Sequence, residues 1–328
     1  MAARRKKIGL IFASGSLLSI KGNRTIFFVD QEKDMLRWLS EVPEISLIAE
    51  ISPFFIQGED DAFTLNSIES MARMIAKNRD SFDGFVVTVR AEHVVPAAVA
   101  VEFMLQGAGK PIIFTGSRYS PEAIAEQDTR RIIKIGGLGL RSNIINATQV
   151  AASQDFPTTA IIFGNKIIKP TKAVYGDFYS MNMFKSLDDD YLGKADFGIT
   201  IHRGKVSSSQ VNMQAKLSRD VAVVCKSIFA SHDRQLLGGV KNADVLLMHV
   251  HENEKLDFKM LEDLREKYAA VLLFNEHYVL DHHGAILLSK MTWTTAVIKA
   301  LWAKEVAKTN DEFISMMRQP VINEFLNL

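Results

Sequence analysis

Runs of consecutive apolar residues alternate along the chain with longer segments in which apolar residues recur at helical spacing. A short apolar run is typical of a strand buried on both faces, and the longer segments are typical of amphipathic helices. Over residues 1–206 the pattern predicts strands at Lys7–Phe12, Ser46–Ile51, Gly84–Val89, Pro111–Thr115 and Thr159–Phe163. Between them it predicts helices at Gln31–Ser40, Asn66–Lys77, Val95–Gln106 and Arg141–Ala152. This alternation indicates a doubly wound, mostly parallel sheet covered by helices.

A similar alternation begins again further along the chain. It predicts strands at Val221–Ser227, Val245–His249 and Ala270–Phe274, and helices at Gln235–Val240, Phe258–Lys267 and Thr292–Lys308. A hairpin-like stretch, Phe197–Val206, closes the first part, and the polar segment Ser207–Lys216 is typical of a linker. With 328 residues, the chain exceeds the length that one hydrophobic core usually serves. We therefore predict a larger α/β domain at 1–206, a linker at 207–216 and a smaller parallel α/β domain at 217–328.

The composition, with 47% hydrophobic and 23% charged residues, is typical of a globular protein. A net charge of +1 argues against nucleic acid or an anionic membrane as the main partner. The only cysteine, Cys225, cannot form an internal disulfide, which favours a reducing compartment. The basic segment Arg4–Lys7 precedes an apolar run too short for a signal peptide, and no run approaches the ~20 apolar residues of a membrane span. These features predict a cytoplasmic protein.

Polar side chains follow several predicted strands, at the edge where open α/β sheets bind ligands. Ser16 stands on a turn after the first strand, where its hydroxyl is either an exposed nucleophile or part of a tight corner. Glu92 follows the strand that ends at Val89; the dipole of a helix starting there stabilises a carboxylate, although a helix cap is the plainer interpretation. Ser117 and Lys172 follow later strands, and Lys172 is either a proton acceptor or a surface charge.

Two further patterns bear on cofactors and metals. Glycines at 136, 137 and 139 precede a predicted helix and could cradle a phosphate, but the strand and ribose-binding acid of a dinucleotide site are missing. His249 and His251 share one strand face, and His277 follows a later strand; these are zinc ligand types, although surface histidines are the plainer interpretation. The sequence therefore predicts no cofactor and no metal.

Four segments occur in an order that resembles one known family. They are ASGSLL at 13–18, GFVVTVRAEHV at 84–94, KPIIFTGSR at 110–118 and RSNIINATQVA at 141–151. They are similar to T-G-G-T-I-A, G-(V/I)-V-x-T-H-G-T-D-T-M, K-P-V-V-L-T-G-(S/A)-Q and N-L-I-N-A of the bacterial and archaeal L-asparaginases. That family includes the amidase subunit of the archaeal tRNA-dependent amidotransferase. Further similar segments, such as KMTWTTAVIKALW at 290–302, extend the resemblance over nearly the whole chain.

The resemblance implies a two-domain α/β fold, a small-molecule ligand as the partner, hydrolysis of a small side-chain amide such as L-asparagine, and a homodimer or dimer of dimers. The family uses two threonines, an aspartate and a lysine. The first threonine falls on Ser16, which keeps the attacking hydroxyl, and the second falls on Ala91, which has none. The aspartate falls on Glu92 and the lysine on Lys172, which follows a shorter loop. The resemblance thus makes Ser16, Glu92 and Lys172 the expected catalytic residues.

The expected substrate-binding residues are Asp60, Asp61, Ala91 and Ser117. The family's pair that receives the α-carboxylate and α-amine aligns with Asp60 and Asp61, whose charges would repel a substrate carboxylate. Arg90 stands where the family has a glycine. We therefore predict an asparaginase-like amidohydrolase that is weak or altered in substrate; the alternative is a catalytically inactive ligand-binding or assembly protein.

Overall fold

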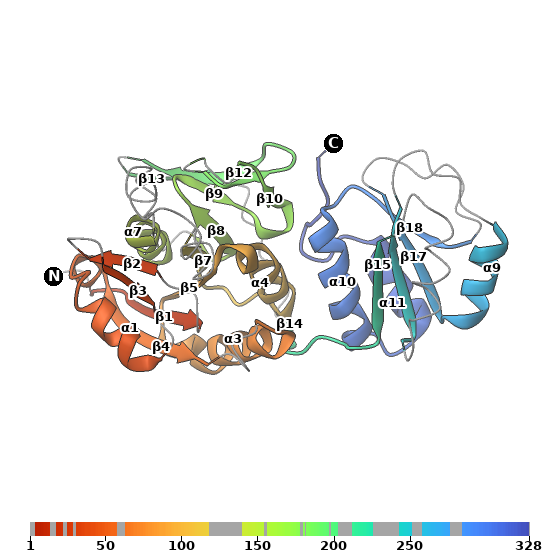
Figure 1. Cartoon of the computed structure of the whole chain (residues 1–328), viewed down its shortest axis with the longest axis horizontal. Coiled ribbons are helices and arrows are strands. Elements are labelled where there is room, and N and C mark those ends of the chain that lie inside the picture. The colour runs from red at the N-terminus through yellow and green to blue at the C-terminus, as the bar shows by residue number, and fades with distance from the viewer. Residues whose placement is uncertain are drawn as a thin grey trace. The chain divides into compact units, whose positions relative to one another are not determined.

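The computed structural model describes residues 4–13, 18–21, 25–28, 31–57, 63–117, 140–153, 156–177, 180, 182–196, 198–202, 212–225, 243–250, 258–275 and 284–327. The chain divides into two compact units, residues 1–215 and 216–328 (Figure 1). Part of the predicted linker belongs to the larger unit, because β14 (Asn212–Met213) pairs with β6 (Leu105–Gln106).

The larger unit is built on a sheet that has eight strands within the described residues. The parallel strands are β8 (Thr159–Phe163), β7 (Ile112–Ser117), β5 (Gly84–Arg90), β1 (Lys7–Ala13) and β4 (Glu50–Ile56), in that order across the sheet. Beyond β8, three antiparallel strands extend the sheet: β9 (Lys166–Ile168), β12 (Tyr191–Ala195) and β13 (Ile199–Ile201). The prediction of a doubly wound, mostly parallel sheet is confirmed.

Helices cover both faces of the parallel strands (Figure 1). One face meets α1 (Glu32–Leu39), α2 (Ile45–Ile48) and α7 (Leu140–Ala151), and the other meets α3 (Leu65–Asn78) and α4 (Ala91–Met104). Side chains alternate between faces along each strand. Leu10 and Phe12 of β1 therefore pack in one core with Trp38 of α1 and Ala147 of α7. The parallel strands all end at one edge of this layered core.

Two predicted elements in the larger unit are placed wrongly. The run around Ser46–Ile51 was expected to be a strand, but residues 45–48 form α2 and the strand β4 starts at Glu50. A short apolar run does not by itself distinguish a helical turn from a strand. Helix α4 starts at Ala91 rather than Val95, directly after β5. Nearly all its side chains are buried, so no polar face marks where it begins.

Several short elements were not predicted. Among them are β2 (Leu18–Lys21), β3 (Thr25–Phe28), the 3-10 turn η1 (Arg79–Ser81), the 3-10 turn η2 (Pro170–Lys172), β10 (Ala173–Tyr175) and β11 (Phe184–Ser186). Strands β10 and β11 pair with each other in antiparallel register. Strands of three or four residues carry too little periodicity to be predicted, because pairing with a neighbour decides that they form.

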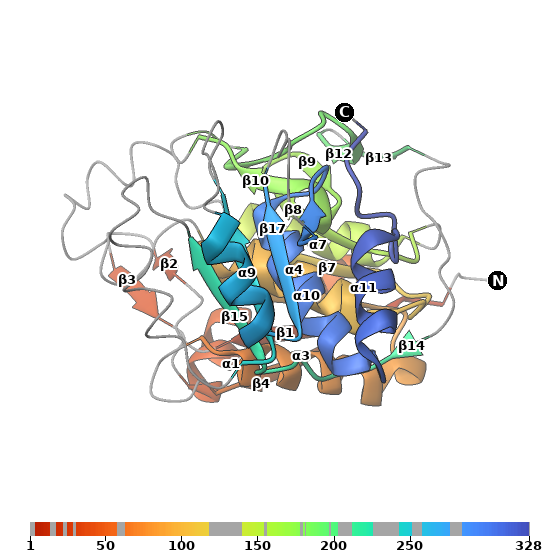
Figure 2. The ribbon, with the colours of Figure 1, turned by 90° about the vertical axis from the view of Figure 1, so that its right-hand side faces the viewer.

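The smaller unit holds a parallel sheet in the order β15 (Val221–Cys225), β16 (Val245–His249), β17 (Ala270–Phe274) and β18 (Ile286–Leu288). Helices α9 (Phe258–Lys267) and α10 (Trp293–Val306) lie on opposite sides of these strands in Figure 1, and α11 (Asn310–Arg318) lies beside α10 in Figure 2. The predicted smaller parallel α/β sheet is confirmed. The helix predicted at 235–240 lies outside the described residues.

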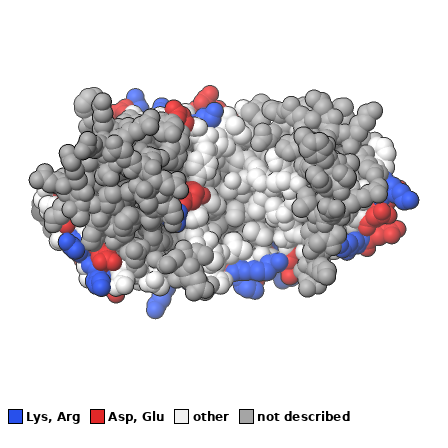
Figure 3. Space-filling model, viewed as in Figure 1, with Lys and Arg blue, Asp and Glu red and all other residues white. Residues whose placement is uncertain are grey.

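Charged side chains of both signs are visible on one face of the molecule (Figure 3). On the face drawn in Figure 3, Lys and Arg side chains stand among Asp and Glu side chains rather than gathering in one area. None of the helices in the described part of the chain is long and apolar enough to cross a membrane.

Candidate active site

The carboxyl end of β5 passes directly into α4 and carries three of the residues singled out by sequence. Arg90 ends the strand, and Ala91 and Glu92 begin the helix. Ala91 is buried, with 3% of its surface exposed. Its carbonyl accepts a hydrogen bond of 2.9 Å from the hydroxyl of Tyr175 in β10. The Glu92 side chain is 44% exposed in the first turn of α4, where the helix dipole stabilises a carboxylate.

The negative charge of Glu92 is balanced by the neighbouring Arg90. Arg90 Nε lies 2.6 Å from Glu92 Oε1. Burial raises the pKa of the Tyr175 phenol, and the negative charge of Glu92 raises it further. Burial lowers the pKa of His93, against the effect of Glu92, and its ring stacks on Phe63 with centroids 4.3 Å apart. This stack holds Phe63 beside the first turn of α4.

The sequence motifs at β7 and α7 serve to hold strand ends together. A Cβ atom at Gly116 would lie 2.0 Å from the Val89 carbonyl oxygen, so only glycine allows β7 to approach β5 there. The Asn143 side chain of α7 donates to the Gly116 carbonyl at 3.1 Å and accepts from the Gly164 amide at 3.0 Å. Asn146 donates to the Gly164 carbonyl at 3.2 Å. The two asparagines of the NIINA segment therefore tie α7 to the turn after β8 and to the end of β7.

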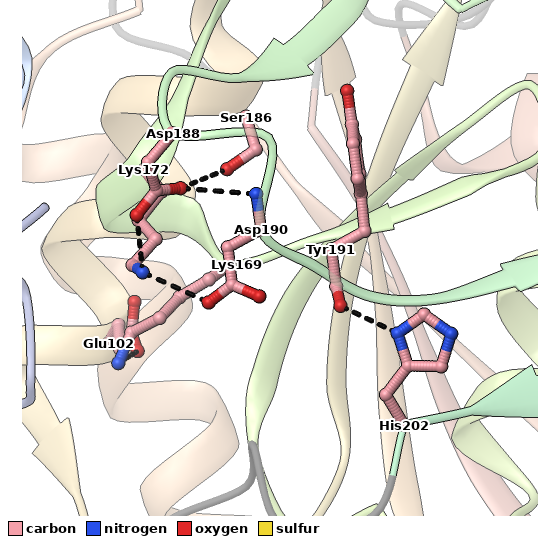
Figure 4. A network of polar contacts seen from close by, with 8 residues as sticks. All are labelled: Glu102, Lys169, Lys172, Ser186, Asp188, Asp190, Tyr191 and His202. Carbon is pink, nitrogen blue, oxygen red and sulfur yellow. Dashed lines mark hydrogen bonds and ion pairs between the residues drawn. The ribbon is translucent and has the colours of Figure 1, made fainter. Parts of the chain in front are cut away.

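Lys172 is a buried residue and not a surface charge. Its side chain, at the end of η2, is 5% exposed. Its Nζ lies 2.6 Å from Asp188 Oδ2 and 3.1 Å from Asp190 Oδ2 (Figure 4). A buried ammonium needs such partners, because an unpaired charge in a protein interior is strongly unfavourable. A second buried lysine lies three residues earlier in the chain: the Nζ of Lys169 is 3.8 Å from Glu102 Oε1.

Asp188 and Asp190 were missed by sequence reasoning. The available signal in the sequence is the run of three aspartates at 188–190. This run looks like an ordinary acidic loop until the structure shows that Lys172 faces it. Asp188 is 1% exposed and Asp190 26%. Tyr175 was missed as well, because nothing in the sequence places β10 against the start of α4.

The structure brings some of the expected site residues together, and others lie outside the described residues. Tyr175 lies three residues after Lys172 and contacts Ala91, so η2, β10 and the start of α4 meet at the carboxyl edge of the parallel strands. Ser117 is the last residue of β7, and its backbone is the register partner of Arg90. Ser16, Asp60 and Asp61, together with the Ser117 side chain, lie outside the described part of the structure, so their roles stay predictions.

The histidine cluster can be followed only at His249. Its ring stacks on Trp293 with centroids 4.8 Å apart and meets Phe274 edge-on, so it belongs to an aromatic cluster next to α10. His251 and His277 lie outside the described residues, as do Gly136, Gly137 and Gly139. Over the part of the chain that is described, no group of three or more His, Cys, Asp or Glu side chains is placed to hold a metal ion.

Residues 7–207, more than half of the chain, match the family model described as "Asparaginase, N-terminal". The chain belongs to the asparaginase family. The family model spans β5, α7 and η2, the elements that carry the candidate site.

Among curated proteins, the chain is similar to L-asparaginase of Dirofilaria immitis, with 30% identity over 112 residues. It is also similar to L-asparaginase 1 of Escherichia coli K12, with 26% identity over 146 residues, and to the human 60 kDa lysophospholipase, with 24% over 211 residues. These matches cover 34%, 44% and 61% of this chain and 17%, 38% and 34% of the relatives, in that order. The chain therefore spans well under half the length of these relatives.

Solved structures of asparaginases share the whole fold. L-asparaginase I of Vibrio cholerae superposes with a TM-score of 0.75 at 19% identity, covering 99% of this chain and 100% of the other. The thermostable L-asparaginase of Thermococcus kodakarensis superposes with a TM-score of 0.71 at 14% identity, covering 98% and 100%. At such identities the likeness shows the fold alone.

Proposed function

We propose that this asparaginase-family protein is an amidohydrolase that converts a small side-chain amide to a carboxylic acid and ammonia, and that it turns over L-asparagine slowly. Family membership supports the reaction class, and the names of the nematode and E. coli relatives make L-asparagine the first substrate to test. One observation carries the slow turnover. The two expected proton-handling groups do not pair with each other, because Glu92 pairs with Arg90 and Lys172 pairs with two aspartates.

In the proposed reaction, Ser16 attacks the carbonyl carbon of the amide. A bond forms between its Oγ and that carbon, the C–N bond breaks, and the nitrogen takes up a proton and leaves as ammonia. Water then hydrolyses the ester and restores the serine. A serine hydroxyl attacks efficiently only when a neighbouring group accepts its proton. Glu92 and Lys172 are the groups that we assign to this proton handling.

Three features slow this reaction. Ala91 offers no hydroxyl to pass the proton, and the loss of general acid–base assistance typically costs about 10²–10⁴ in rate. Arg90 Nε lies 2.6 Å from Glu92 Oε1, which leaves only the other carboxylate oxygen of Glu92 for another group. Asp60 and Asp61, which replace the residues that receive the substrate's α-carboxylate in the family, repel that carboxylate.

The test is ammonia release from L-asparagine by the purified protein. We expect kcat/KM below the ordinary enzyme range of ~10⁴ M⁻¹s⁻¹, loss of the remaining activity in Ser16→Ala, and a decrease in Lys172→Met. Lys169→Met is the matched control, because it removes a neighbouring buried lysine that is paired with Glu102 instead. Activity that survives Ser16→Ala would contradict the assigned nucleophile, and an ordinary kcat/KM would contradict the slow turnover.

The second candidate is an asparaginase-like protein that binds a ligand, or serves in an assembly, without catalysis. The buried methyl group of Ala91 favours it, because this position carries a proton-relaying hydroxyl in the family. Calorimetry with L-aspartate separates the candidates, since binding needs no proton transfer. We expect weak binding by the natural protein and tighter binding by the double variant Asp60→Ser, Asp61→Gln. Tight binding without any ammonia release would favour the second candidate.

We also propose that the protein is cytoplasmic and forms a homodimer or a dimer of dimers with twofold symmetry. In the asparaginase family the pocket is completed by the second domain of a neighbouring subunit, and residues 216–328 form a compact unit here. Light scattering at micromolar concentration is expected to give at least twice the chain mass of 36.7 kDa. A monomer mass would contradict the assembly.

A further inference from the structure

The immediate partners of Lys172 are two carboxylates from the loop between β11 and β12. In Figure 4 the Lys172 ammonium lies between Asp188 and Asp190, and the ring of Tyr191 points away from it. The distances are 2.6 Å to Asp188 Oδ2 and 3.1 Å to Asp190 Oδ2. Two negative charges in direct contact are enough to balance one ammonium group. Lys172 therefore has its counter-charges without Glu92, the residue that the family pattern would pair with it.

Asp188 is held in place by groups other than the lysine. Its Oδ1 accepts a hydrogen bond of 2.9 Å from the Ser186 hydroxyl and one of 3.2 Å from the Asp190 amide. This leaves Oδ2 directed at Lys172. A carboxylate held by both a side chain and the backbone cannot follow a moving partner, so its position determines where the ammonium lies. Positioning of this kind is how a protein keeps a charged group ready for reaction.

The backbone of the loop explains why two aspartates reach one lysine. The Asp189 amide donates to the Ser186 carbonyl at 3.3 Å and closes a turn, and Asp189 itself has a φ of 53°, in the left-handed region. The Leu187 amide also donates to the Lys172 carbonyl at 2.9 Å, which holds the loop against η2. The side chain of Asp189 is exposed, whereas those of Asp188 and Asp190 turn inward to the lysine.

We propose that Lys172, Asp188 and Asp190 act as one unit in the amide hydrolysis, and that Asp188 is the positioning residue that sets where the Lys172 ammonium lies. Glu92 is outside this unit. The inference rests on the proposed function, because the unit is useful to catalysis only if Lys172 is.

The test is a double-mutant cycle on kcat/KM for L-asparagine, with Lys172→Met, Asp188→Asn and the double variant. We expect each single change to lower kcat/KM by about 10²-fold, mainly through kcat, and the double variant to be no worse than Lys172→Met. Glu92→Gln combined with Lys172→Met is expected to lose activity further, by the product of the two single effects. Effects of Asp188→Asn and Lys172→Met that simply multiply, or a Glu92→Gln effect that vanishes in Lys172→Met, would overturn the unit.

Two variants in the same loop serve as controls. Asp189→Asn changes an exposed carboxylate of the same run, at a φ that asparagine also adopts, and is expected to leave kcat and KM unchanged. Asp188→Glu keeps the charge and is expected to recover part of the activity lost in Asp188→Asn. A loss in Asp189→Asn as large as in Asp188→Asn would mean that the loop matters only through its folding.

Folding is followed by the melting temperature of each variant. Asp188→Asn removes one partner of a buried charge and is expected to lower it, whereas adding Lys172→Met removes the other charge and is expected to restore part of the loss. If Asp188→Asn does not fold, Asp190→Asn replaces it in the cycle, since Asp190 is 26% exposed. Its expected loss in kcat/KM is about tenfold, and this loss should vanish in Lys172→Met.

The failure of the proposed function can be told apart from the failure of this inference. If the natural protein releases no ammonia, the proposed function is wrong, and the same cycle is measured as the affinity for L-aspartate by calorimetry. A loss of affinity in Asp188→Asn that disappears in Lys172→Met then supports the positioning role at a binding site. Independent effects, or no detectable binding of L-aspartate at all, overturn it.

Discussion

Lys299 of the smaller unit and Lys172 of the larger unit are both buried and paired with carboxylates, but their ion pairs differ in how far they are exposed to solvent. Lys299 in α10 of the smaller unit pairs with Glu324 at 2.5 Å, and both side chains are completely buried. Lys299 Nζ also donates to the carbonyls of Met317 and Gln319, and Glu324 accepts from the Val321 and Ile322 amides. This pair fastens the C-terminal segment to α10, and no part of it reaches solvent.

The charged edge of the larger unit is open by comparison. Asp190 beside Lys172 is 26% exposed, and Glu92 beside Arg90 is 44% exposed. A fully buried ion pair is out of reach of a ligand, whereas a partly exposed one can contact a ligand. Burial of a lysine is therefore no guide to function until the exposure of its partners is known.

The largest effect is expected at the fully buried pair. Glu324→Gln leaves the Lys299 ammonium buried without its counter-charge, and we expect the free energy of unfolding to fall by about 3–5 kcal/mol. Urea unfolding followed by circular dichroism measures this. The double variant Lys299→Met, Glu324→Leu removes both charges and should recover most of the loss. A loss below ~1 kcal/mol in Glu324→Gln would mean that the pair is accessible to water after all.

A smaller effect is expected where Tyr175 joins β10 to the start of α4. Tyr175→Phe removes the hydrogen bond to the Ala91 carbonyl, and we expect the free energy of unfolding to fall by about 0.5–1.5 kcal/mol. The ring contact with Phe184 remains, so the change isolates the hydroxyl. The same urea titration measures it. An unchanged stability would show that water replaces the phenol at this carbonyl without loss.

The open pair should matter still less for stability. Glu92→Gln breaks the contact with Arg90, but at 44% exposure we expect the free energy of unfolding to change by less than about 1 kcal/mol. Added salt should reduce even this difference. A loss as large as that of Glu324→Gln would remove the distinction between the two regions, and it would make Glu92 a structural residue.

The smallest effect concerns pH. The pKa of His93 is lowered by burial, so near its usual value of 6.5 the unfolded chain binds the proton more tightly than the folded protein does. The stability that depends on neutral His93 is therefore present above pH 6.5 and decreases as the pH falls below it. His93→Phe should flatten the dependence of the unfolding free energy on pH between about 7 and 5 while keeping a ring against Phe63. An unchanged dependence would assign it to other groups.

Much of the fold could be predicted, for a reason visible in particular strands. The strands at 159–163, 245–249 and 270–274 have the predicted bounds because a parallel strand covered on both faces needs an unbroken apolar run. The start of α4 could not be predicted because this helix is apolar on nearly all sides. Part of the candidate site was open to sequence reasoning too, since Glu92 follows a strand whose end was predicted. The strands on either side of Lys172, β9 and β10, were not predicted.

The sequence by itself determined the family, the alternation of strands and helices, and which residue types stand at the strand ends. Only the tertiary structure decided which of the charged residues pair with each other, because ion pairs depend on which segments meet in space. Arg90 and Glu92 are close in sequence, but their contact depends on the abrupt change from β5 to α4. Lys172 and Asp188 are 16 residues apart and meet because the loop between β11 and β12 is hydrogen-bonded to η2 through the Leu187 amide and the Lys172 carbonyl. Periodicity records which side of an element is buried, and it carries no information about which charges then face one another.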